Sequence, residues 1–157
     1  MEIRFANEQD FGQLAEMKWL HGGEDDADYG EHNLDGVDKD QFLAEFVAFL
    51  QSDSHYRIFV ADDGGRIASA MFVCEIPKLP KPNGRAQSVA YLTNVYTRSE
   101  YRNHGIGTRL LEHIKQYLTA RQCELVFAWP SDHSVNWYER NGFLPDGEIR
   151  QCGLVGE

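Results

Sequence analysis

The chain has 157 residues, 42% hydrophobic and 12% aromatic, a composition ordinary for a single globular domain over 1–157. Its formal net charge of −10 lies entirely in the first 50 residues, which hold 13 acidic and 3 basic residues, whereas the remaining 107 hold 12 of each. No apolar run reaches the roughly 20 residues that span a bilayer, and no basic face interleaved with aromatic residues points to a nucleic-acid partner.

The N-terminus is predicted to form a strand followed by a helix. A short strand is expected over 3–6. Asn7 is expected to be the N-cap, with Asp10 three residues later completing a capping box. Apolar residues then recur at helical spacing over 11–19, and His21-Gly22-Gly23 is expected to end this helix.

Residues 22–35 form a strongly acidic segment that is expected to be a polar loop. Its charge is concentrated in Glu24-Asp25-Asp26-Ala27-Asp28. Asp35 or Asp38 then caps a second helix, whose apolar face consists of Phe42, Leu43, Phe46, Val47 and Leu50.

A β-hairpin is expected in the middle of the chain. Residues 56–61 and 66–76 have strand character, and Asp62-Asp63-Gly64-Gly65 between them tolerates the positive φ angles of a tight turn. Residues 77–85 contain three prolines and Asn83-Gly84, so they are expected to form a loop.

The remaining elements alternate between strands and helices. A strand is expected over 87–97, an amphipathic helix over 105–121 and a second strand over 124–129. A short helix then ends at Asn141-Gly142, and a final hairpin is expected from residues 143–144 and 148–155.

The junction between the strand 87–97 and the following helix carries Gly105 and Gly107. Glycines at a strand-to-helix junction let a ligand approach the backbone, and the helix start offers unpaired N–H groups and a positive partial charge. This combination predicts a diphosphate-binding site. The third glycine of the dinucleotide fingerprint is absent, and no Gly-Lys is followed by Ser or Thr, so those two nucleotide motifs are excluded.

The pattern Arg-x-x-Gly-x-Gly, preceded by Ser99-Glu100-Tyr101, resembles the pyrophosphate loop of the GNAT superfamily of N-acetyltransferases, which bind acetyl-coenzyme A. Tyr138-Glu139-Arg140-Asn141-Gly142-Phe143 resembles the later signature of that family. The resemblance extends over roughly residues 56–145, and the element order agrees in the first 55 residues. It implies an α/β (α+β) fold with a mixed, mostly antiparallel sheet flanked by helices. It also implies that strands 87–97 and 124–129 splay apart to form a cofactor cleft.

The resemblance also implies a set of residues that hold acetyl-coenzyme A, which serves as cosubstrate. The backbone of Val95, Tyr96 and Thr97 would pair with the pantetheine arm, and one N–H would face the acetyl oxygen. The backbone N–H groups of the loop would wrap the diphosphate, and the Thr108 hydroxyl would add a hydrogen bond to it. The residues of this loop are Arg102, Asn103, His104, Gly105, Ile106, Gly107 and Thr108. Ser134 is small and could contact the cofactor. His104 stands where the family often has Lys or Arg, and Ser131 where it commonly has Asn.

Two catalytic groups are expected. The family places the tyrosine that matches Tyr138 beside the cofactor sulfur as general acid, and a phenol with a pKa of ~10 is well matched to a thiol. An alkyl amine must also lose a proton before it attacks. Glu75, late in strand 66–76, is a candidate base by position, and Glu31 and Asp28 are further candidates.

These features predict an acetyl-coenzyme-A-dependent N-acetyltransferase. No Cys or Ser lies in an obvious nucleophile motif, which favours direct transfer to a primary amine. The acidic first third favours a cationic acceptor, such as a polyamine, an aminoglycoside-like compound or a lysine-bearing peptide. Two alternatives remain open: a non-catalytic acyl-coenzyme-A sensor on the same fold, and an interaction protein whose acidic segment docks a basic partner.

The cysteines bear on the cellular compartment. Cys74, Cys123 and Cys152 are odd in number and widely spaced, so they are expected to be thiols in a reducing compartment. The N-terminus lacks the apolar run of a signal peptide, so a cytoplasmic location is expected. The six histidines and three cysteines show no metal-ligand spacing, so no metal is expected. A homodimer is an open expectation from the family.

Overall fold

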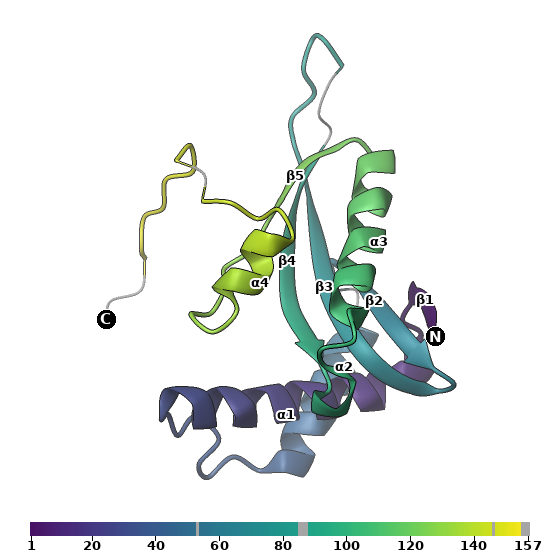
Figure 1. Ribbon diagram of the computed structural model, residues 1–157, viewed down its shortest axis with the longest axis vertical. Helices are drawn as coiled ribbons and strands as arrows, with labels where there is room; N and C mark the ends of the chain where they lie inside the picture. The colour runs from purple at the N-terminus through teal and green to yellow at the C-terminus, as the bar shows by residue number, and fades with distance from the viewer. Residues whose placement is uncertain (53, 85–87, 146, 155–157) are drawn as a thin grey trace. The chain divides into compact units, whose positions relative to one another are not determined.

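The computed structural model describes residues 1–52, 54–84, 88–145 and 147–154 (Figure 1). It consists of two compact units, Met1–Phe127 and Ala128–Glu157. The second unit is too short to bury a core of its own. That size supports the expectation of a single domain over 1–157, which stays a prediction.

The first unit is built on one sheet of five strands in sequence order (Figure 1). The first four strands pair antiparallel and the last two pair parallel, which makes the sheet mixed but mostly antiparallel. The strands are β1 (Glu2–Phe5), β2 (Tyr56–Asp63), β3 (Arg66–Pro77), β4 (Ser88–Thr97) and β5 (Cys123–Phe127).

Helices cover both faces of this sheet. They are the single-turn η1 (Glu8–Asp10), α1 (Phe11–Tyr29), α2 (Lys39–Gln51), the single-turn η2 (Ser99–Tyr101) and α3 (Ile106–Ala120). The second unit contains the short helix α4 (Val135–Arg140).

Two aromatic contacts show which helix covers which face. Phe72 on β3 stands opposite Ile58 in register, and Phe59 is the next residue of β2, so Phe72 and Phe59 point to opposite faces. Phe46 of α2 lies 6.4 Å from Phe72, whereas Tyr117 of α3 lies 5.2 Å from Phe59, both measured between ring centroids. Helices α1 and α2 therefore pack on one face and α3 on the other (Figure 1).

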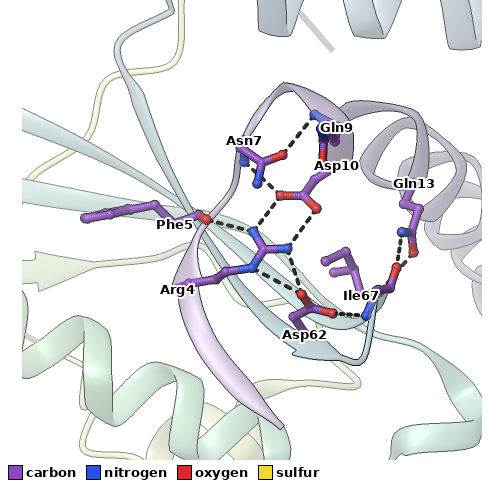
Figure 2. Close-up of polar contacts among 9 residues, drawn as sticks. Arg4, Phe5, Asn7, Gln9, Asp10, Gln13, Asp62 and Ile67 are labelled. Carbon is purple, nitrogen blue, oxygen red and sulfur yellow. Dashed lines mark hydrogen bonds and ion pairs between the residues drawn. The ribbon is translucent and has the colours of Figure 1, made fainter.

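A polar network fixes the start of α1 against the sheet (Figure 2). The Arg4 guanidinium donates to both oxygens of Asp10, at 2.7 and 3.0 Å, and to Asp62 at 2.9 and 3.2 Å. The predicted capping box is present: the Asn7 side chain caps the turn η1, and Asp10 accepts from the Asn7 backbone. Gln13 on α1 bonds the backbone at the end of the β2–β3 hairpin.

The prediction that the first helix stops at His21-Gly22-Gly23 is wrong. Helix α1 continues to Tyr29 and ends at Gly30, whose φ of 64° is the left-handed conformation of a helix C-cap. Residues 22–29 of the expected polar loop are therefore helical. The reason is tertiary: a Cβ at Gly22 would lie 3.5 Å from Leu34, so the glycines provide the surface on which Leu34 packs.

The segment after α1 folds back onto that helix. The Leu34 backbone N–H donates to Asp26 at 2.9 Å, and the Asn33 side chain donates to the other Asp26 oxygen at 2.9 Å. Asp38, one of the two predicted caps, then begins α2 by accepting from the Gln41 N–H. Asp26, one acid of the acidic segment, thus holds the chain between α1 and α2 against α1.

Strand β4 leaves its partner β5 part of the way along. The pairs run from Ser88 with Cys123 to Tyr91 with Phe127, where β5 ends, while β4 continues to Thr97. This arrangement confirms the predicted splayed strand pair. On its other side, β4 carries one extra residue relative to β3, because Phe72 pairs with Thr93 while Ala70 pairs with Tyr96. Such a β-bulge redirects the backbone locally.

The prediction of a final hairpin from 143–144 and 148–155 is wrong for the described residues. Residues 143–145 and 147–154 form no strand, and Val155 lies outside the described residues, as do residue 87 of the predicted strand 87–97 and residue 85 of the loop 77–85. In the described part of the chain, no helix is long and apolar enough to cross a membrane. No group of three or more His, Cys, Asp or Glu side chains in that part is arranged to hold a metal ion.

Candidate active site

The loop before α3 has the backbone geometry of an anion site. Asn103 and Gly105 both have left-handed φ angles, of 63° and 73°. Gly105 is the N-cap of α3 and provides no side-chain cap. Because the first N–H groups of a helix have no partner within the helix, the donors of Ile106, Gly107 and Thr108 are available at this end. Alternating conformations of this kind form a concave nest of N–H groups that binds phosphate oxygens.

The space beside Gly105 is open in the described part of the chain. A Cβ built on Gly105 would meet no atom within 4 Å. A surface pocket is lined by Glu100, Tyr101, His104, Gly105, Ile106, Thr108 and Arg109. The residues present therefore fit the diphosphate of coenzyme A, through main-chain donors and the positive end of α3.

The end of β4 has an outer edge that no strand of the described sheet covers. Val95, Tyr96 and Thr97 follow the bulge, in which Asn94 has a left-handed φ of 51°. They lie beyond the last pair with β5, so their outer edge has no strand partner in the described sheet. Main-chain groups at such an edge need other partners; the Thr97 carbonyl accepts from Arg102, and an extended amide-bearing chain would suit the groups before it. Five residues, 98–102, separate the end of this strand edge at Thr97 from the start of the nest at Asn103.

The loop arginine does not point its charge at the nest. The Arg102 Nε donates to the Thr97 carbonyl at 2.9 Å, and its Nη2 donates to Glu24 of α1 at 2.5 Å. The side chain thus ties the loop to β4 and α1, while its backbone leads into the nest. His104 is exposed, and its Nδ1 lies 3.4 Å from the Tyr101 carbonyl.

Tyr96 is the centre of a charged cluster that the sequence did not predict. Its ring is buried, and its hydroxyl donates to Glu24 at 2.8 Å. Burial, and next the Glu24 carboxylate, raise the pKa of Tyr96 to about 12, so the phenol remains a neutral donor. The Arg102 guanidinium carbon lies 5.4 Å from the centroid of the same ring, a cation–π distance.

His21 extends the cluster along α1. Its ring stacks on Tyr96 with centroids 5.1 Å apart, and its Nε2 lies 3.6 Å from Asp25. Burial lowers the pKa of His21, which favours the neutral ring. Burial also lowers the pKa of Lys18, one helical turn earlier on α1.

Glu75, the predicted base, is paired with Arg121 and stays a prediction. Both of its carboxylate oxygens accept from the Arg121 Nε, at 2.9 and 3.0 Å. Arg121 caps the C-terminal end of α3, whereas the nest is at the N-terminal end, roughly 20 Å away at 1.5 Å per residue. The structure therefore does not bring Glu75 together with the nest. Of the other candidate bases, Asp28 is on α1, and Glu31 accepts from Asn33.

The second unit holds Tyr138 and Ser134. Tyr138 is buried on α4 between Trp137 and Phe143, with ring centroids 5.0 and 5.3 Å from its own. The Phe143 N–H donates to the Tyr138 carbonyl at 3.0 Å, which explains the spacing of the second motif. The Ser134 hydroxyl bonds the Ser131 carbonyl at 3.0 Å, one turn before Tyr138 on the chain.

The chain matches the model of the acetyltransferase (GNAT) family over residues 17–143, so it belongs to that family. A comparison with curated protein sequences gave no match. The protein is accordingly an acyltransferase, with acetyl-coenzyme A as its cosubstrate.

Solved structures of similar fold cover nearly the whole chain. A predicted acetyltransferase from Clostridium acetobutylicum, determined with acetyl-coenzyme A, is 19% identical with a TM-score of 0.70, covering 98% of this chain and 96% of its own. A GCN5-related N-acetyltransferase from Ralstonia eutropha is 19% identical with a TM-score of 0.69, covering 98% and 99%. An acetyltransferase from Trypanosoma brucei is 21% identical with a TM-score of 0.65, also covering 98% and 99%.

Sequence reasoning missed His21 and Glu24 as site residues because it assigned their segment to the end of a helix and a loop. The sequence did hold a signal for these residues, namely the helical spacing of the polar side chains. If the helix continues past the glycines, one stripe of its surface holds Lys18, His21, Glu24, Asp25 and Asp28.

Proposed function

We propose that this protein transfers an acetyl group directly from acetyl-coenzyme A to a primary amine on a small cationic molecule or a peptide. The observation that carries the proposal is the pairing of an open main-chain nest at Gly105 with an acidic helix. Glu24 of that helix bonds Tyr96, next to the free edge of β4. The nest suits a polyanion, and the acidic helix suits a positively charged acceptor.

Each group has a distinct task in this reaction. Acetyl-coenzyme A supplies a thioester whose carbonyl carbon accepts the amine nitrogen. The main-chain N–H groups of 103–108 hold the diphosphate, and the edge at Val95–Thr97 positions the thioester and directs one N–H at its oxygen. Removing a donor of this kind costs about 2.7–4 kcal/mol of transition-state stabilisation in other enzymes. Tyr138 is assigned as the acid that protonates the departing sulfur, and the proton that the amine nitrogen loses returns to the Tyr138 phenolate through solvent water.

The test combines binding and turnover. Calorimetry with acetyl-coenzyme A should give a saturable heat, and a free-thiol assay over a panel of primary amines should identify acceptors. Tyr138→Phe should keep the acetyl-coenzyme A affinity and lower kcat by about 100-fold. Tyr117→Phe, which removes the hydroxyl of a tyrosine that packs on Phe59 of the sheet, is the matched control and should keep full activity. A protein that binds the thioester but acetylates no amine would contradict the proposal.

The proposal includes a cytoplasmic location and a homodimer. Cys74, Cys123 and Cys152 are free thiols, which supports a reducing compartment. Exposed apolar side chains in the C-terminal segment, Leu144, Ile149 and Leu154, support self-association. Fractionation of cells and light scattering of the purified protein test these two statements.

A further inference from the structure

The β2–β3 hairpin contacts the loop that carries the nest, although none of its residues lines the pocket at the nest. We infer that Asp63 and Arg66, which flank the turn of this hairpin, are positioning residues for acetyl-coenzyme A. They hold Tyr101 and Glu100 of η2, and thereby fix the loop in the conformation that receives the diphosphate. This inference rests on the proposed function, because it takes the nest as the diphosphate site.

Two side-chain contacts join the end of the hairpin to η2. The Tyr101 hydroxyl donates to the Asp63 carboxylate at 2.9 Å, and the Arg66 Nη2 donates to Glu100 at 2.5 Å. The hydrogen bond to Asp63 raises the pKa of Tyr101, so the hydroxyl stays protonated and remains a donor. Tyr101 and Glu100 line the pocket at the nest, whereas Asp63 and Arg66 do not. The hairpin therefore acts on the pocket through two of its lining residues.

The residue before η2 is attached to the same hairpin. The Arg98 Nε donates to the Ile67 carbonyl at 2.8 Å, and the Arg98 backbone N–H donates to the Ala68 carbonyl at 2.9 Å. Arg98 is buried, so these bonds are shielded from water and strong. The start of η2 is thus fixed on β3, and the contacts of Asp63 and Arg66 decide how the rest of η2 lies.

The turn is itself held in place from its other side. Asp62 accepts from the Arg4 guanidinium of β1, at 2.9 and 3.2 Å, and Gln13 of α1 donates to the Gly65 carbonyl at 2.8 Å (Figure 2). Because β1 and α1 fix the turn independently of η2, the turn is a firm support against which the loop can be held.

The nest depends on support from η2. Gly105 has no side-chain cap, and Asn103 has a left-handed φ of 63°, a conformation that is costly for a residue with a Cβ. Arg102 alone separates Asn103 from η2. When η2 is fixed, less conformational entropy is lost as Asn103 and Gly105 order around the diphosphate. Preorganisation of this kind raises affinity without adding a contact to the ligand.

The charge of Glu100 gives Arg66 a second task. A carboxylate that lines a pocket for a diphosphate repels the ligand. The Arg66 guanidinium lowers the pKa of Glu100, which therefore stays ionised and paired. Arg66 thus offsets an adverse charge at the pocket in addition to holding η2.

Calorimetry of the full chain with acetyl-coenzyme A tests the role of Asp63. Asp63→Ala should raise the Kd about fivefold, because Tyr101 loses its partner. On electrostatics alone, removal of an acid near a polyanion site would lower the Kd, so the sign of the change separates the two explanations. Asp63→Asn keeps an acceptor oxygen for the Tyr101 hydroxyl, and its Kd should stay within about twofold of the wild type.

Arg66 is tested in the same way. Arg66→Met should raise the Kd about fivefold, because η2 loses a tie and Glu100 loses its counter-charge. Arg66→Lys keeps a cation at this position, and its Kd should stay within about twofold of the wild type.

Gly64→Val is the control for a change in stability alone. It strains the turn at a left-handed φ of 64°, but a Cβ there meets no atom within 4 Å, so Asp63 and Arg66 keep their contacts. It should lower the Tm and leave the Kd within about twofold of the wild type.

The outcomes separate this inference from the proposed function. An unchanged or lower Kd in Asp63→Ala or in Arg66→Met overturns the positioning role of that residue. A loss of affinity in Asp63→Asn or Gly64→Val as large as that in Asp63→Ala overturns the role of the Asp63 hydrogen bond. If Gly105→Val also leaves the Kd unchanged, the nest does not hold the diphosphate, and the proposed function fails together with the inference.

Discussion

Two segments of this protein carry paired glycines, and they use them in opposite ways. Gly105 has a left-handed φ of 73° and opens the start of α3, with no neighbouring atom near its missing side chain. Gly22 and Gly23 have helical conformations in the interior of α1, and their missing side chains are covered by Leu34. The first segment leaves its backbone open, whereas the second brings another part of the chain close.

The difference shows that the structural role of a glycine depends on its backbone conformation and on the residues packed around it. At the α3 start, both the backbone conformation and the open space depend on a few consecutive residues. In α1, the glycines matter because a residue 11 or 12 positions later packs on them, and because His21 just before them and Glu24 just after them reach β4.

The largest expected effect is on acetyl-coenzyme A binding, when Gly105 of the first segment is substituted. Gly105→Val places a β-branched residue at a left-handed φ, which costs about 1–2 kcal/mol, and puts methyl groups over the N–H donors. We expect the Kd for acetyl-coenzyme A to rise about 100-fold, equivalent to about 2.7 kcal/mol. Calorimetry measures this change. Gly64→Val, at a similar φ of 64° in the β2–β3 turn, is the control and should lower stability alone.

Leu34→Ala should damage the other segment selectively. It removes part of a half-buried side chain from the surface of Gly22 and Gly23, so we expect a loss of about 1–2 kcal/mol in unfolding free energy. The acceptor KM should rise severalfold, because α1 carries the cluster at Tyr96, while acetyl-coenzyme A affinity stays constant. Urea unfolding and steady-state kinetics test both parts. Leu144→Ala, at a side chain 72% exposed, should change stability by less than about 0.5 kcal/mol.

Gly22→Ala should have the opposite sign to Gly105→Val. The new Cβ would lie 3.5 Å from Leu34, an ordinary contact, and alanine is favoured over glycine inside a helix by about 1 kcal/mol. We expect an increase of about 0.5–1 kcal/mol in stability, measured by urea unfolding. Gly12→Ala, where a Cβ on α1 meets nothing within 4 Å, gives the reference for propensity alone. A loss of stability in Gly22→Ala alone would mean that Leu34 cannot accommodate the methyl group.

The smallest effect is a pH dependence at His21. Burial lowers the pKa of His21, with Asp25 and Glu24 opposing the shift and Lys18 and Arg102 adding to it. The unfolded chain therefore binds more protons here below its pKa of about 6.5, so acid should weaken the fold in that range and down to the folded pKa. We expect the Tm of the wild type to fall more between about pH 7.5 and about pH 5.5 than that of His21→Phe. Equal falls would show that His21 titrates normally.

The sequence predicted the elements whose signals are local. The hairpin at Gly64-Gly65, the Asn7 capping box and the glycine-opened start of α3 depend on short runs of residues, and the structure has each of them. The splayed strands followed from the family resemblance, and the structure has them as well. The helix stop at Gly22 failed because the glycine signal was read without Leu34, which is distant in sequence and adjacent in space.

The amino-acid sequence by itself indicated the family through its two motifs, and the order of most elements and the glycine loop before α3 through glycine spacing and apolar periodicity, because these signals lie in short runs of residues. Only the tertiary structure decided that α1 extends beyond its glycines and brings Glu24 and His21 to Tyr96, and that Glu75 pairs with Arg121 at the far end of α3. The physical reason is that these contacts join residues about 45 to 75 positions apart, and side-chain pairing over such separations depends on how helices pack on the sheet.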